Sequence, residues 1–184
     1  MMYWTGGTTE LSCAIDSLAM LSRRVLFDFK AADDFSSWDI INDGVMGGQS
    51  KGYLDFTEEG FGRFYGTVSL DNLGGFTSIR CKLPFTEVSK FTSLVFRVKG
   101  SGPSFQIRVK HRHEDYHDYV ASFATNANWS NIHIPLTSFI PLWQGSRVNL
   151  PRFDRESICE FKFLIANRRN ESFELLIDKI ELLS

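Results

Sequence analysis

Period-two alternation of apolar and polar residues is the feature that most constrains the fold of this chain. From Arg24 onward, apolar residues recur at every second position in short runs, as at Phe105, Ile107 and Val109. Turn-forming residues separate about ten such runs, and no amphipathic helices alternate with them. Because parallel sheets need crossover helices, the pattern predicts an all-β protein, a sandwich or jelly roll.

The expected strands follow this alternation along the chain. Glu58-Glu59-Gly60 separates two of the runs and predicts a hairpin. Pro135, Pro141 and Pro151 predict a long irregular stretch before the last two strands. In chain order, the expected strands are 25–29, 38–41, 53–56, 61–70, 76–83, 94–98, 105–109, 119–123, 129–134, 161–165 and 173–182.

Residues 9–22 carry the one pattern with helical spacing. Leu11, Ile15 and Leu18 share one face of it, and Thr9 is a suitable N-cap. We therefore expect an N-terminal extension, 1–23, with a short helix, followed by a single β-sandwich domain, 24–184. Packing against the domain and docking to a partner are both open for this helix, but its polar face lacks the Lys and Arg of membrane-surface helices.

Charge and cysteine content limit the partners and the compartment. The 184 residues hold 20 Lys and Arg against 22 Asp and Glu, so we expect no nucleic-acid partner. No apolar run reaches the roughly 18 residues of a membrane span, so we expect no direct membrane insertion. Cys13, Cys81 and Cys159 are far apart, which favours a reducing compartment. We expect the bacterial cytoplasm, or the mitochondrial matrix if the chain is eukaryotic.

Two enzyme motifs occur in part. Gly48-Gln49-Ser50-Lys51-Gly52 matches a nucleophile elbow, but a strand-like segment follows where that motif needs a helix. Gly60-Phe61-Gly62 begins a dinucleotide fingerprint, but its third glycine is one residue late and no helix follows. We therefore expect no enzyme activity and no cofactor.

The His-rich segment 111–118 is the weak candidate for a metal site. His111 and His113 share a strand face, and His117 would return across a hairpin toward them. The alternative is a solvated polar hairpin tip. We expect no metal here and keep the three histidines as weak candidates.

Two glycine-dense segments, 38–50 and 64–80, have the most unusual composition. Each combines glycines with an Asn and an Asp. Glycine among strands marks a bulge, a turn with positive φ or a close backbone approach. The segments therefore form either Asx turns and bulges at the corners of the sandwich or a polar recognition surface lined by backbone.

The same segments carry a family resemblance. W-x-x-x-N-D-G-V-M-G-G-x-S and F-x-G-x-V-S-L-x-N-x-G-G-F-x-S-x-R resemble the thirty-kilodalton complex I intermediate-associated protein family. Trp129 with Ile134-Pro135-Leu136 and Phe139, and the closing strand Phe173–Ile180, extend the resemblance from about Val25 to the C-terminus. It implies a galactose-binding-like jelly roll. The family's mitochondrial members are assembly factors of respiratory NADH dehydrogenase, and this chain is more similar to stand-alone bacterial members.

The resemblance also implies a site for a ligand or partner. Within it, Arg80 is suited to a bidentate contact with a carboxylate or a pair of sugar hydroxyls, and Trp129 to an aromatic wall. A salt bridge between Asp43 and Arg80 that pins the two glycine loops is the structural alternative. The candidate residues are Asn42, Asp43, Met46, Gly47, Gly48, Ser50, Asn72, Gly74, Gly75, Ser78, Arg80 and Trp129.

Three functions compete at this point. The first is a non-catalytic assembly module that recognises a protein partner, with subunits or intermediates of a membrane complex expected, through the glycine-rich loops. The alternative is a carbohydrate-binding module with a sugar ligand on an exposed Trp143 or Tyr116. The least favoured is a metal-dependent jelly-roll enzyme.

Overall fold

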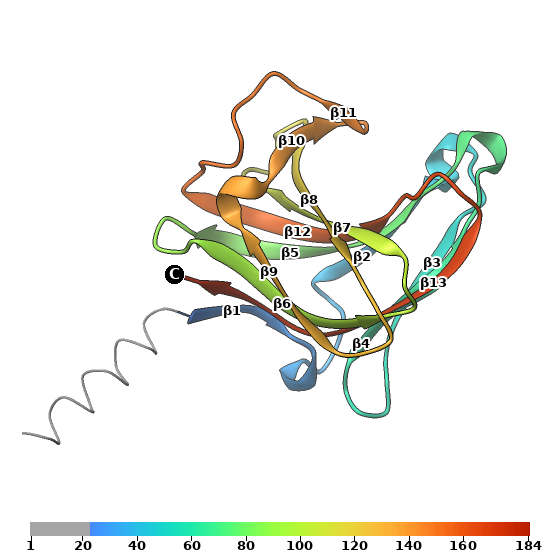
Figure 1. Cartoon of the computed structure of the whole chain (residues 1–184), viewed down its shortest axis with the longest axis horizontal. Helices are drawn as coiled ribbons and strands as arrows, with labels where there is room; N and C mark the ends of the chain where they lie inside the picture. Colours follow the sequence, from blue (N-terminus) through green and yellow to red (C-terminus); the bar gives the residue numbers. More distant parts are fainter. Residues whose placement is uncertain (1–22) are drawn as a thin grey trace, which may run out of the picture.

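The computed structural model describes residues 23–184, which form two antiparallel sheets packed face to face (Figure 1). The expected helix at 9–22 lies outside the described residues. The prediction of an all-β sandwich is confirmed, because the helical turns within the described part are short 3-10 turns. No helix within residues 23–184 is long and apolar enough to cross a membrane.

The first sheet has six strands in the order β3-β4-β13-β6-β9, with β1 also paired to β13. The predicted hairpin is confirmed, since Tyr53 of β3 lies opposite Tyr65 of β4. The strands are β1 (Arg23–Asp28), β3 (Lys51–Phe56), β4 (Gly62–Val68), β6 (Ser93–Gly100), β9 (Ser130–Pro135) and β13 (Glu171–Leu183).

The second sheet has seven strands in the order β11-β10-β8-β7-β12-β5-β2. Neighbours far apart in the sequence meet here, because β12 lies between β7 and β5. The strands are β2 (Trp38–Asn42), β5 (Thr77–Glu87), β7 (Ser104–Lys110), β8 (Asp118–Ala124), β10 (Ile140–Trp143), β11 (Ser146–Arg147) and β12 (Ser157–Ile165).

Four 3-10 turns connect the strands: η1 (Phe29–Ala31), η2 (Asp43–Met46), η3 (Asp71–Leu73) and η4 (Leu136–Ser138). The turns η2 and η3 lie together at one end of the sandwich (Figure 1). They belong to the two glycine-dense segments, so these segments meet in space.

Aromatic side chains fill the space between the sheets. Phe96 from the first sheet meets Phe123 and Phe163 from the second edge to face, with ring centroids 4.8 and 5.3 Å apart. Trp38 packs against Phe161 in the same way. One face of each sheet is therefore committed to the core, and alternation turns the intervening side chains outward.

The prediction of a long irregular stretch after Pro135 is wrong in part, because β10 and β11 lie within it. Pro141 occupies a strand position opposite Tyr119, and its carbonyl oxygen accepts a hydrogen bond from the Val148 N–H at 3.2 Å. Proline lacks only the donor, so a short strand near the edge of a sheet tolerates it.

Candidate functional site

Asp43 is the polar centre of the glycine-dense segments. It is 1% exposed, and its carboxylate accepts hydrogen bonds from Ser50 N and Ser50 Oγ at 3.0 and 2.5 Å. It also accepts from Gly75 N at 2.7 Å and Phe76 N at 3.3 Å. One buried carboxylate thus links the two segments through Ser50, Gly75 and Phe76, and we name these four residues the Asp43 hub.

The hub stabilises the charged form of Asp43. Burial alone pushes the pKa of this carboxyl upward, but the hydrogen bonds from Ser50, Gly75 and Phe76 together outweigh it and hold the pKa below its ordinary value. The Ser50 hydroxyl belongs to the hub, because it donates to Asp43 and accepts from Ser69 N at 3.0 Å.

Close packing around the hub accounts for several of the glycines. A Cβ at Gly48 or Gly74 would collide with the carboxylate of Asp43. Asn42 repeats the arrangement one residue earlier, since its Oδ1 accepts from Gly52 N at 3.0 Å and Thr77 Oγ1 at 2.6 Å. Asp43 and Asn42 thus fasten these loops through bonds to residues 7 to 35 positions away, and not through the local Asx turns expected for them.

The suggested salt bridge between Asp43 and Arg80 is wrong. Arg80 donates from Nε and Nη2 to Asp39 Oδ2, at 3.2 and 2.7 Å, because it lies within β5 with its side chain on the outer face of the sheet. Ser78, two residues earlier, donates to the Ile41 carbonyl at 3.3 Å. Ser78 and Arg80 therefore lie on β5, farther along the strand from the hub.

Trp129 lies at the other end of β4 from the hub. Its ring packs on Phe61, which precedes β4, with centroids 4.5 Å apart, whereas Ser69, a hub neighbour, follows β4. The Arg97 guanidinium lies 4.6 Å from the centre of the Trp129 ring. The structure therefore does not bring Trp129 together with the glycine loops.

The loop tip above the hub displays an apolar side chain. Asn72 and Leu73 of η3 have left-handed φ values of 54° and 63°. Leu73 is 90% exposed, and Leu70 beside it is also exposed. In the neighbouring loop, Met46 ends η2 and Gly47 follows in the left-handed conformation.

The three histidines have different partners in the structure. His111 Nδ1 lies 3.0 Å from Ser157 Oγ, and His113 Nδ1 lies 3.6 Å from Cys159 Sγ. His117 is buried against the ring of Tyr119. Across residues 23–184, no three His, Cys, Asp or Glu side chains are grouped in a way that could hold a metal ion.

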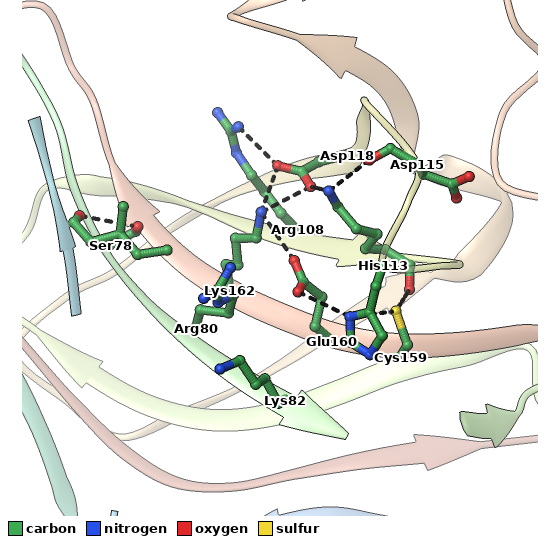
Figure 2. Close-up of polar contacts among 12 residues, drawn as sticks. Ser78, Arg80, Lys82, Arg108, His113, Asp115, Asp118, Cys159, Glu160 and Lys162 are labelled. Atoms are coloured by element: carbon green, nitrogen blue, oxygen red, sulfur yellow. Dashed lines mark hydrogen bonds and ion pairs between the residues drawn. The ribbon is translucent and has the colours of Figure 1, made fainter. Parts of the chain in front are cut away.

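A second polar region covers the outer face of β5, β12 and β7 (Figure 2). The strand register puts Arg80, Lys162 and Arg108 directly opposite one another across these three strands. We name this line of three side chains the cationic row. In the next line, Glu160 lies between Lys82 and Lys110 in the same register.

Asp118 is the main counter-charge of the row. It accepts from Lys162 Nζ at 2.9 and 3.0 Å and from Arg108 Nη1 at 3.4 Å, with Lys110 Nζ 3.7 Å away. Burial raises the pKa of Asp118, but these three cations outweigh it and the pKa lies below its ordinary value. Asp39 is shared in the same way by Arg80 and Lys82.

Sequence reasoning selected Arg80 but missed the rest of this region. Arg108 and Lys162 each stand in an alternating strand pattern, which predicts that they point outward and nothing about their neighbours. Only the pairing of β12 with both β5 and β7 brings the three cations into one line.

A pocket of about 530 Å³ adjoins this face where β8 and β10 meet β9. Gln106 and Val120 line it on the side of the cationic row, and His133 and Arg152 line other parts of its wall. Near the far end of β10, the exposed rings of Tyr116 and Trp143 meet edge to face with centroids 6.1 Å apart.

Sequence comparison finds relatives among complex I intermediate-associated proteins. The chain is 28% identical over 147 residues to "Complex I intermediate-associated protein 30, mitochondrial" of Drosophila melanogaster, which spans 70% of this chain and 46% of that protein. It is 21% identical over 153 residues to the Mus musculus protein of the same name, with 71% and 47% covered. The chain thus spans about half the length of these curated relatives.

Comparison of structures shows the fold. A family 11 carbohydrate-binding module of a cellulosomal cellulase from Clostridium thermocellum superposes with a TM-score of 0.68 at 20% identity, covering 88% of this chain and 94% of the module. A family 29 module superposes with a TM-score of 0.56 at 11% identity, covering 88% and 90%. The sandwich is therefore a jelly roll of the galactose-binding-like type.

A family profile matches most of the domain. Residues 27–177 fit the profile described as Complex I intermediate-associated protein 30 (CIA30), a span that runs from β1 into β13 and includes both glycine-dense segments. The described fold and this match together show that the chain belongs to the CIA30 family.

Proposed function

We propose that this chain is a non-catalytic binding and assembly module that recognises a protein partner through its two glycine-rich loops. Its relatives are named as complex I intermediate-associated proteins, which supports subunits or intermediates of that membrane complex as partners. We place it in a reducing compartment, a bacterial cytoplasm or a mitochondrial matrix. Cys81 and Cys159 are both free and buried, which supports this assignment.

The exposed Leu73 is the observation that carries the proposal. A left-handed backbone costs a non-glycine residue on the order of 1–3 kcal/mol, and Leu73 has a φ of 63°. It is also 90% exposed, so its apolar surface gains nothing from the core. The Asp43 hub anchors the chain two and three residues after Leu73, through Gly75 N and Phe76 N. A partner that covers Leu73 and Leu70 would recover the apolar burial.

The test is an affinity pull-down of the tagged full chain from its own organism, read by mass spectrometry. We expect enrichment of subunits of respiratory NADH dehydrogenase, and loss of that enrichment with a Leu70→Ser/Leu73→Ser double variant. Phe85→Ser is the matched control, because Phe85 is also 70% exposed but lies in β5 away from η3.

Two outcomes contradict the proposal. If no subunit of a membrane complex is enriched by the unaltered chain, the assembly role is wrong. If subunits are enriched equally by the unaltered chain and the double variant, the role stands but the glycine loops are not the recognising surface. Melting temperatures of all variants exclude unfolding as the cause of a loss.

A sugar-binding function is the second candidate, and the exposed pair of Tyr116 and Trp143 favours it. These rings are 61% and 48% exposed and meet edge to face, so their faces are accessible for stacking on a sugar. One of the similar modules is described in complex with a β-1,3-1,4-mixed-linked tetrasaccharide. The same oligosaccharide is therefore the first probe for this chain.

Titration calorimetry with that tetrasaccharide tests the candidate. Binding that falls at least tenfold in Trp143→Ala, with a Trp129→Ala control unchanged, would support it. Absence of heat at millimolar sugar, or equal binding by both variants, would reject it.

A further inference from the structure

We propose that the outer face of the second sheet binds a small organic anion, with its phosphate or carboxylate group on the cationic row and its uncharged body in the adjoining pocket. This inference is independent of the glycine loops and of the protein partner proposed for them. It rests on the register of three strands, on the charge balance of the face and on the position of the pocket.

The register is the first argument. Arg80 and Arg108 are both direct cross-strand partners of Lys162, so three like charges stand in one line over adjacent strands. Directly opposed side chains lie about 4.5–5.5 Å apart at Cβ, and like charges at that distance destabilise a sheet. An acidic residue in place of Lys162 would stabilise the sheet more. The next line shows this arrangement, with Glu160 between Lys82 and Lys110.

The charge balance is the second argument. Asp118 serves three cations and Asp39 serves two, and Glu160 lies 3.2 Å from Lys162. The face thus carries more positive than negative groups in a chain whose net charge is −2. The side chains of Lys162 and Arg108 keep only 14% and 15% exposure, so water screens this local excess weakly. An anion bound there would balance it.

Arg80 has donors to spare for such an anion. A guanidinium carries five N–H groups in a planar fork suited to phosphate and carboxylate oxygens. Arg80 holds Asp39 through Nε and Nη2, and within residues 23–184 its Nη1 makes no hydrogen bond. Figure 2 shows its side chain on the same face of the sheet as those of Lys162 and Arg108.

The pocket is the third argument, because it begins where the row ends. Val120 is the cross-strand partner of Arg108, and Gln106 stands two residues from Arg108 on the same face of β7. Both line the pocket, whose volume of about 530 Å³ lies in the range of small-molecule sites. Its wall mixes polar groups, such as Ser122 and His133, with the apolar Leu142. This composition suits a hydroxylated body better than a purely apolar one.

The experiment compares three probes that share one ring and differ in charge: glucose, glucuronate and glucose 6-phosphate. Binding to the full chain is measured by titration calorimetry and by NMR amide shifts at low and at physiological salt. We expect at least one of the two anionic probes to bind tenfold or more tightly than glucose, with shifts in β5, β7, β8 and β12. Comparison of the two anionic probes identifies the preferred group, and added salt should weaken binding.

Variants locate the site. Arg80→Gln removes a partly exposed cation and should weaken binding of the preferred anionic probe at least tenfold, as should Arg108→Gln. The control is Arg63→Gln, which removes a cation paired with Asp55 on the first sheet and should bind as the unaltered chain does. Because Arg108 is the more buried, Arg80→Gln keeps the test valid if the other variant does not fold.

Several results would overturn the inference. Equal affinity for glucose and both anions would make the charge irrelevant, and no saturable binding of either anion would leave the face without such a ligand. Unchanged anion binding by a folded Arg80→Gln protein, or shifts confined to η2 and η3, would exclude the cationic row. None of these results bears on the capture of a protein partner by Leu73, so the two proposals can fail separately.

Discussion

The Asp43 hub and the cationic row differ in how their charges are balanced. In the hub, one buried carboxylate receives hydrogen bonds from Ser50, Gly75 and Phe76, all donors supplied by the chain itself. In the row, three cations stand side by side, and together with Lys82 and Lys110 they share the three carboxylates of Asp39, Asp118 and Glu160. The hub is complete without a ligand, whereas the row gains from one.

This contrast separates residues that build loops from residues that are available to bind. The polar atoms of Asp43 and Asn42 are used internally, so these side chains act by shaping the loops that display Leu73. Under the proposed function, a motif rich in Gly, Asn and Asp supports the loop, and the binding contacts come from neighbouring residues.

The largest expected effect is the loss of the hub by Asp43→Ala. The two donors of Ser50 are buried and those of Gly75 and Phe76 are partly buried. A buried donor left without its acceptor costs about 1–3 kcal/mol and a partly buried one less, so we expect the free energy of unfolding to fall by about 3–5 kcal/mol. Urea denaturation followed by tryptophan fluorescence measures it. Asp71→Ala, an exposed aspartate in η3, is the control, and equal losses in the two variants would contradict the role of the hub.

Gly48→Ala tests the close packing around the hub. A Cβ at this position meets the carboxylate of Asp43, and we expect a loss of about 1–3 kcal/mol, as for other overpacked sites. Gly44→Ala, in the same loop, has nothing within 4 Å of its Cβ and should change stability by less than about 0.5 kcal/mol. The same denaturation measurement serves both, and a neutral Gly48→Ala would show that the loop relaxes easily.

Acid should weaken the hub in a graded way. The pKa of Asp43 is lower in the folded chain than its ordinary value, so its stabilising contribution is fully present above that ordinary value. It is lost as the pH falls from about 5 through the folded pKa. Melting temperatures between pH 7 and pH 3 should therefore fall less steeply for a folded Asp43→Asn protein than for the unaltered chain. Parallel curves would show that the hydrogen bonds to Asp43 do not lower its pKa.

The smallest effect is expected in the cationic row. Arg80→Gln removes the ion pair with Asp39 but also relieves repulsion from Lys162, so stability should change by no more than about 0.5 kcal/mol. A loss of about 2 kcal/mol would instead assign the row a structural role like that of the hub. Denaturation of the same sample used for anion binding decides between them.

Local sequence patterns predicted much of the fold. Alternation identified most of the strands, and the turn at Glu58-Glu59-Gly60 correctly predicted the β3–β4 hairpin. The prediction of an irregular stretch around Pro141 is wrong. Prolines favour irregular structure, but a short strand near the edge of a sheet accepts one. The Asp43–Arg80 pairing failed for a related reason: two charges near the same motif need not share a face.

The sequence by itself determined the all-β class and the places where glycine is needed, because side-chain alternation and backbone freedom are local properties. Tertiary structure decided which groups meet. Asp43 accepts hydrogen bonds from backbone amides more than 30 residues away. Arg80, Arg108 and Lys162 are neighbours only because their strands pair. Register between distant strands is set by packing of the whole core, which no single segment encodes.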